Sequence, residues 1–302
     1  MKGDKFLRRS TQPKISNVPV ALAVCVLAFG ICAPGQRRRA ERREVSAATR
    51  ERSTKSVSHE GMSLTYDAAA LGTEVRAETV AASPLEQATD KPVGVYPRHV
   101  AFTLTGAYPE RLHSYISPVV RVCPVAEYKQ AFAASEGLPG EAEQVIRRLR
   151  RLLRTQPASF KGEVPSLPFA DGHTPFRAHT KYLRFKNGTG IVFLAQGQQD
   201  EGLINNQKLA YEFRGLTDDG LYYVTAEFPV AAPFLPDSID ATSFEGYSLP
   251  YSFWAKNRAR LVKQYGAYIS GVKVRLEKLP PAKFQPNLKL LDKLLSSLEV
   301  RK

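Results

Sequence analysis

Cysteine is scarce in this sequence. The 302 residues include Cys25, Cys32 and Cys123, and the first two lie inside one hydrophobic segment. Cys123 therefore has no disulfide partner in the rest of the chain, which excludes a disulfide framework. The apolar run around Cys123 favours a small buried hydrophobe over a reactive thiol, because no base or metal-ligand spacing accompanies it.

The motifs of familiar catalytic and metal sites are also missing. The five histidines are scattered, without the HExxH or CxxC spacing that holds zinc. The nearest approach to a nucleophile elbow, from Gly246 to Pro250, ends in proline where the motif needs glycine. Gly188-Thr189-Gly190 lacks the further glycine and the lysine of a phosphate-binding loop. We therefore predict no catalytic residues, no metal and no cofactor.

Positive charge is plentiful but unevenly distributed. The formal net charge is +14, and residues 1–56 carry thirteen Lys or Arg against four Asp or Glu, a net of +9. Residues 57–302 carry thirty against twenty-five, a net of +5. Because most of the excess lies in the N-terminal stretch, we do not expect nucleic acid as a partner of the remaining chain.

One long stretch has no charged side chain. It covers residues 17–35 and follows a basic N-terminus. We predict that residues 1–35 are a signal peptide or signal anchor with an N-terminal hydrophobic helix, and that residues 17–35 contact the membrane. Arginines also follow the segment, so charge alone leaves its membrane orientation open, and its cleavage is equally open.

Residues 36–56 are polar and basic, without apolar periodicity. We predict a disordered linker there. Its basic side chains could contact anionic lipid head groups, or the segment could be a solvated spacer. The candidates for membrane-surface contact are Arg37, Arg38, Arg39, Arg42 and Arg43.

Residues 57–302 are predicted to form a single α+β domain. Two turn signals, Asn187-Gly188 and Asp218-Asp219-Gly220, separate extended runs with alternating apolar residues. We therefore expect an antiparallel sheet that includes a four-strand meander over about residues 181–230. Earlier strands are expected near residues 61–66, 73–80, 99–104 and 119–123, and a last one near residues 297–300.

Helical spacing of apolar residues predicts helices that pack against this sheet. They cover about residues 141–155, 251–279 and 287–297, with a shorter helix over residues 125–134. In the first of these, arginines surround a single apolar face. Residues 156–175 are rich in Pro, Gly and Ser and predict a long loop.

Four residues of the meander are candidate ligand contacts. Three consecutive amides before a strand could bind a polar ligand, or they could cap their own backbone. Aromatic side chains farther along could line a groove or form a core stripe. Glu212 and Glu227 lie on facing strands, and we interpret them as exposed. The ligand-binding candidates are Asn205, Asn206, Gln207 and Tyr222.

Several short strings lie between Tyr182 and Pro236. They are Y-x-x-F-x-N-G-x-G from Tyr182, I-N-N-Q from Ile204, and G-L-T-D-D-G-x-Y-Y from Gly215. In these strings the chain resembles a family of uncharacterised exported bacterial proteins. The resemblance implies export and supplies no activity. The closing order of strand pair, long helix and leucine-rich helix also resembles the PsbP-like α-β-α sandwich at the level of fold.

These features lead to two functional hypotheses. The first is an exported or membrane-anchored, extracytoplasmic envelope protein whose domain is a non-enzymatic module binding a partner protein or a small ligand. The alternative is an envelope hydrolase with an unrecognised site near residues 205–219. A pocket that gathers two carboxylates would favour the hydrolase, and a flat apolar patch would favour interaction with a protein.

Overall fold

The computed structural model describes residues 53–83, 94–133, 140–160, 162–238, 240–241, 243–244, 247–248 and 258–301. All of them belong to the second of two units, Met1–Ser46 and Ala47–Lys302. The predicted hydrophobic helix and the arginines from Arg37 to Arg43 lie outside the described residues. Within the described residues, none of the helices has the length and apolar character needed to cross a bilayer.

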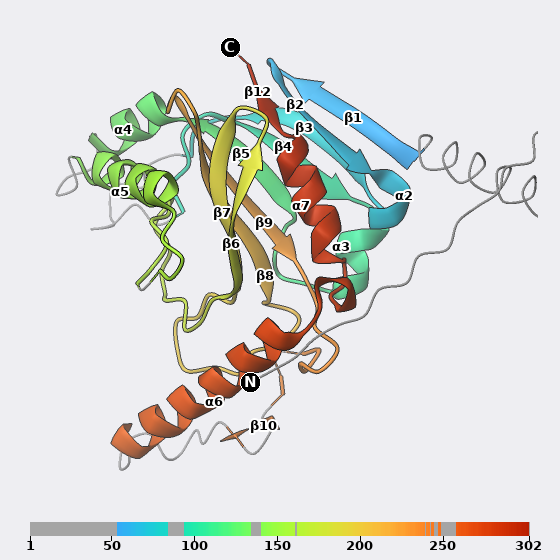
Figure 1. Cartoon of the computed structure of the whole chain (residues 1–302), viewed down its shortest axis with the longest axis vertical. Coiled ribbons are helices and arrows are strands. Elements are labelled where there is room, and N and C mark those ends of the chain that lie inside the picture. The colour runs from blue at the N-terminus through green and yellow to red at the C-terminus, as the bar shows by residue number, and fades with distance from the viewer. Residues whose placement is uncertain are drawn as a thin grey trace, which may run out of the picture. The chain divides into compact units, whose positions relative to one another are not determined.

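The fold is α+β and is built around an antiparallel sheet of seven strands (Figure 1). The strand order is β3-β4-β5-β9-β8-β7-β6, so the predicted meander from β6 to β9 is confirmed and is joined to the earlier strands through the β5–β9 pair. The strands are β3 (Glu74–Val80), β4 (His99–Thr105), β5 (Val119–Pro124), β6 (Ala178–Phe185), β7 (Gly188–Ala195), β8 (Ala210–Thr217) and β9 (Tyr222–Pro229).

A smaller sheet joins the two ends of the described chain. Its order is β1-β2-β12, formed by β1 (Thr54–His59), β2 (Met62–Asp67) and β12 (Glu299–Val300). Thr54 to Ser56 therefore belong to a strand, although they fall within the range predicted as linker. Alternate residues of β2 are buried, which explains why its pattern was visible in the sequence.

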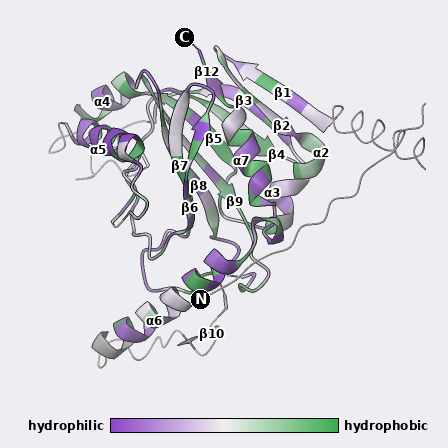
Figure 2. Ribbon diagram, in the orientation of Figure 1, coloured by the Kyte–Doolittle hydropathy of each residue, from purple (hydrophilic) through white to green (hydrophobic). Residues whose placement is uncertain are grey.

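Helices cover both faces of the central sheet (Figure 1). On one face lie α4 (Val125–Ala133) and α5 (Glu141–Thr155), and the predicted apolar face of α5 is buried against β7, β8 and β9. Figure 2 shows mainly hydrophilic colours over the rest of α5. The opposite face packs against α7 (Leu288–Ser297), α6 (Arg258–Lys278) and β2. The short elements are α2 (Ala68–Leu71), α3 (Ala107–Leu112), β10 (Ser243–Phe244), β11 (Tyr247–Ser248) and the 3-10 turn Pro281–Lys283.

The predicted Asn187-Gly188 turn also holds the C-terminal strand. The side-chain Nδ2 of Asn187 donates to the backbone carbonyl of Val300 at 2.5 Å. The Oδ1 of the same side chain accepts from the backbone N–H of Val300 at 3.0 Å. A side chain on Gly190 would overlap the Phe213 ring, because the backbone and this ring lie in direct contact. The asparagine and glycines of this string therefore have structural roles in the hairpin and its packing.

Candidate ligand-binding cavity

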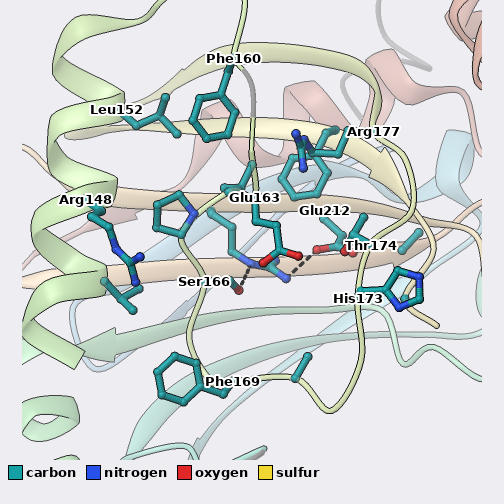
Figure 3. Close-up of a pocket in the computed structure, with 18 of the residues that line it drawn as sticks. Arg148, Leu152, Phe160, Glu163, Ser166, Phe169, His173, Thr174, Arg177 and Glu212 are labelled. Carbon is teal, nitrogen blue, oxygen red and sulfur yellow. Dashed lines mark hydrogen bonds and ion pairs between the residues drawn. The ribbon is translucent and has the colours of Figure 1, made fainter. Parts of the chain in front are cut away.

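A cavity of about 810 Å³ lies between α5, the following loop and the face of the sheet (Figure 3). The loop is the predicted one and runs from the end of α5 to β6. Strands β7, β8 and β9 contribute Phe193, Glu212, Arg214 and Glu227 to the cavity wall. The site therefore combines one rigid surface, the sheet, with one helix and one irregular segment.

Polar contacts hold the loop against the sheet. The Tyr223 hydroxyl, buried on β9, donates to the Leu167 carbonyl at 3.1 Å and accepts from the Leu167 amide at 3.2 Å. Nearby, Arg214 Nε donates to Ser166 Oγ at 2.8 Å. Farther along, His173 and Gln198 exchange backbone hydrogen bonds of 2.8 and 3.0 Å. The loop backbone is thus fixed at three points around the cavity.

The sheet side of the cavity, which we call its floor, carries Glu212, Arg214 and Glu227, with Arg214 between the two carboxylates. The Arg214 side chain is only 9% exposed, and its Nη2 lies 2.6 Å from Glu212 Oε2. Its Nη1 donates to Thr225 Oγ1 and the Phe213 carbonyl, both at 2.9 Å, and to the Ala226 carbonyl at 3.3 Å. A buried guanidinium is tolerated when its donors and its charge are matched in this way.

Two carboxylates face each other across the β8–β9 pair. Glu212 and Glu227 are directly opposite in register, an arrangement that is unfavourable for like charges. Arg214 offsets the repulsion, since its Nη2 is also 3.8 Å from Glu227 Oε1. Arg121 approaches Glu227 from β5 at 4.0 Å. The expectation that both glutamates are exposed was wrong for Glu212, whose side chain is 15% exposed.

The surroundings of Glu212 raise the pKa of its carboxyl group. Burial raises the pKa of Glu212 above its ordinary value, and the nearby Glu227 charge raises it further, while Arg214 opposes the shift. Burial removes water from the charged carboxylate, which explains the direction.

The remaining walls are apolar and cationic. Arg148 and Arg151 come from α5, Lys208 precedes β8, and Arg177 precedes β6. Arg177 donates to the Gly162 carbonyl, and its guanidinium lies 5.6 Å from the centre of the Phe160 ring. Burial lowers the pKa of Arg177, partly opposed by Glu163. Apolar wall residues include Val145, Leu152, Phe160, Val164, Phe169 and Phe193.

The three consecutive amide residues predicted as ligand contacts do not line the cavity. Asn206 accepts from the Ala232 amide at 2.9 Å and donates to Asp237 Oδ1 at 2.9 Å, with longer contacts to two carbonyls. Asn205 donates to the Leu203 carbonyl and accepts from the Lys208 amide. Both side chains are buried, and these hydrogen bonds join them to other parts of the same chain. The backbone carbonyl of Gln207 accepts from Ser114 Oγ and the Tyr115 amide.

Tyr222 is not brought close to these amides. It opens β9 beside the turn at Thr217, whereas the amides precede the other end of β8, where Ala210 pairs with Pro229. None of Asn205, Asn206, Gln207 and Tyr222 is among the residues lining the cavity. Asp218 is also elsewhere, in an exposed ion pair with Arg184 at 2.9 Å.

Sequence reasoning interpreted Glu212 as exposed and gave Arg214 no functional role. Both point to the same side of β8, and charged residues at alternate positions usually indicate a solvent-exposed face. The only available signal was the Glu212–Glu227 register implied by the Asp218-Asp219-Gly220 turn. It could show the two carboxylates meeting but not that a distant loop and α5 cover them.

In the described part of the chain, no three His, Cys, Asp or Glu side chains are grouped so that they could hold a metal ion. No family model, curated protein or solved structure matches the chain. The resemblances to exported bacterial proteins and to the PsbP-like fold therefore stay predictions.

Glu212→Gln is expected to change the pH dependence of unfolding. Because the folded-state pKa of Glu212 is raised above 4.5, its stabilising contribution is complete below that pH and is lost as pH rises through the folded pKa. The free energy of unfolding of the wild type relative to Glu212→Gln should fall as pH rises above 4.5. Urea titrations at a series of pH values measure this difference, and a rise with increasing pH would contradict the assignment.

Proposed function

We propose that this chain is an exported or membrane-anchored envelope protein whose domain binds a small ligand without transforming it. The observation that carries the proposal is the cavity of about 810 Å³, which combines apolar and cationic walls with the fixed polar groups around Arg214. Concave sites of this size and composition are typical of small-ligand binding. A flat surface, by contrast, would have favoured a protein partner.

The floor of the cavity supports binding more than turnover. Arg214 directs its donors to Glu212, Ser166, Thr225 and backbone carbonyls, all within the protein. These contacts stiffen the floor and leave the guanidinium committed to its neighbours. A preformed, rigid wall reduces the free-energy cost of ordering the site when a ligand binds.

Ligand binding can be tested with N-phenyl-1-naphthylamine, a neutral dye that fluoresces in apolar surroundings. We expect saturable binding at one site per chain. Gly197 lines the cavity and has open space where a side chain would project. Gly197→Trp should therefore add an indole at the cavity wall and weaken binding by about tenfold or more, equivalent to roughly 1.4 kcal/mol.

Gly266→Trp is the matched control, because Gly266 on α6 also faces open space but does not line the cavity. Its affinity for the dye should equal that of the wild type. Absence of saturable binding, or equal affinity in Gly197→Trp, would overturn the assignment of this cavity.

A hydrolase is the second candidate, and a specific observation favours it. The cavity gathers Glu212, whose pKa is raised, and Glu227 on the facing strand. A carboxyl group with a raised pKa beside a second carboxyl group is an arrangement that supports general acid–base chemistry. Glu212 also falls within residues 205–219, where the alternative hypothesis placed its site.

The hydrolase candidate predicts turnover in a screen of ester, phosphoester and glycoside substrates. Glu212→Gln should then abolish turnover while the domain stays folded, because the amide cannot transfer the proton. Glu141→Gln, on α5 but not among the residues lining the cavity, serves as the control. Turnover that persists in Glu212→Gln would reject this cavity as a hydrolase site, and turnover lost only in that variant would reject a purely binding role.

The proposed cellular location of the domain is argued from the sequence of residues 1–56. The uncharged stretch over residues 17–35 supports contact with a membrane, and the resemblance to exported proteins supports the outer side. In the anchored form, Arg37, Arg38, Arg39, Arg42 and Arg43 would lie next to lipid head groups.

Protease treatment of cells tests this location. After the outer layers are opened and the cytoplasmic membrane is left intact, added protease should degrade the domain and spare a cytoplasmic marker. Survival of the domain together with the marker would show that it faces the cytoplasm.

A further inference from the structure

The charges that line the cavity do not balance. Five cationic side chains, Arg148, Arg151, Arg177, Lys208 and Arg214, face three carboxylates, those of Glu163, Glu212 and Glu227. The excess is two positive charges, with His173 left out. A net positive charge around a cavity attracts anionic ligands, because the low-dielectric walls concentrate the field.

The carboxylates are concentrated on the floor, where cations of the protein already match them. Glu212 lies 2.6 Å from Arg214, and Glu227 lies within reach of both Arg214 and Arg121. The cations that remain are Arg148, Arg151, Arg177 and Lys208, with Glu163 as the carboxylate outside the floor group. The positive excess is therefore located on the walls outside the floor group.

Two of these cations form a pair on α5. Arg148 and Arg151 are three residues apart, so they project from the same side of the helix, and both line the cavity. Both are exposed, and neither forms an ion pair with a carboxylate in the described part of the chain. Arg147 on the outer side differs, since it lies 3.5 Å from Glu143. Two neighbouring guanidinium groups suit a carboxylate, sulfonate or phosphate.

Apolar surface adjoins this pair. Leu152 lies on the same helix, and Phe160 lies beside it in the wall (Figure 3). Val145 and Phe193 continue the apolar surface toward the sheet. A ligand whose charged group meets Arg148 and Arg151 would therefore place the rest of its structure against hydrocarbon, where burial is favourable at about 25 cal/mol per Å².

We infer that the cavity binds an amphipathic anion, with its acidic group at Arg148 and Arg151 and its apolar body against Leu152, Phe160 and Phe193. This inference rests on the proposed ligand-binding function and adds the chemical class of the ligand. The acidic group can belong to a free acid or to the head group of a lipid, because both present the same oxygens to the arginines.

A pair of dyes separates charge from apolar binding. 1-Anilinonaphthalene-8-sulfonate has the aromatic body of N-phenyl-1-naphthylamine with an added sulfonate. We expect the sulfonate dye to bind about tenfold more tightly at low salt, and to lose this advantage as salt is raised. The double variant Arg148→Gln/Arg151→Gln should reduce its affinity to that of the neutral dye and leave the neutral dye unaffected.

Arg147→Gln/Arg150→Gln is the matched control, with the same spacing and charge change on α5 but outside the cavity. Its binding of the sulfonate dye should be unchanged. Displacement of the dye by dodecanoate would identify a free acid as the source of the anion, and displacement by phosphatidylglycerol vesicles would identify a lipid. Either result supports the inferred class.

Different results would contradict the ligand-binding function and the anionic class of the ligand. If neither dye binds at one site, the proposed ligand-binding function is wrong. If the neutral dye binds as tightly as the sulfonate dye, or both double variants reduce sulfonate binding equally, the cavity binds ligands but the anionic class is overturned. Circular dichroism and thermal unfolding of each variant show that the fold is retained.

Discussion

The buried guanidinium of Arg214 is the interaction on which the cavity depends. A charge at 9% exposure is tolerated because Glu212 neutralises it and protein acceptors take up its donors. The same group reaches Glu227, which would otherwise repel Glu212 directly opposite. It also reaches Ser166 in the loop, so one side chain connects the floor of the cavity with its cover. Removing one partner from such a buried pair typically costs about 3–5 kcal/mol.

Successive side chains of β8 point to opposite faces of the sheet, so the residues of the core and those of the cavity lie on different faces. Tyr211 and Phe213 point into the core formed with α7, whereas Glu212 and Arg214 point toward α5 and the loop. The first face contributes to an apolar cluster that joins β2, α6 and α7. The second face combines an apolar region under α5 with the charged floor. A cavity on this second face leaves the main core of the domain intact.

Local patterns allowed much of the fold to be predicted. The Asn187-Gly188 turn and the apolar face of α5 are encoded within a few residues, so their periodicity was sufficient. The burial of Glu212 was not predictable in this way, because it depends on Ser166 and Tyr223 holding a distant loop over the sheet. The consecutive amides suggested a ligand, but Asn206 bonds to residues at 232 and 237, a contact that only the folded chain reveals.

Amide hydrogen exchange in Arg214→Lys tests most directly the claim that Arg214 holds the loop on the cavity floor. Lysine keeps the positive charge near Glu212 but lacks the planar fork that also reaches Ser166 and Thr225. The account predicts faster exchange over residues 162–177, with protection in β2 and α7 unchanged. Unchanged exchange over residues 162–177 in a folded Arg214→Lys variant would contradict it.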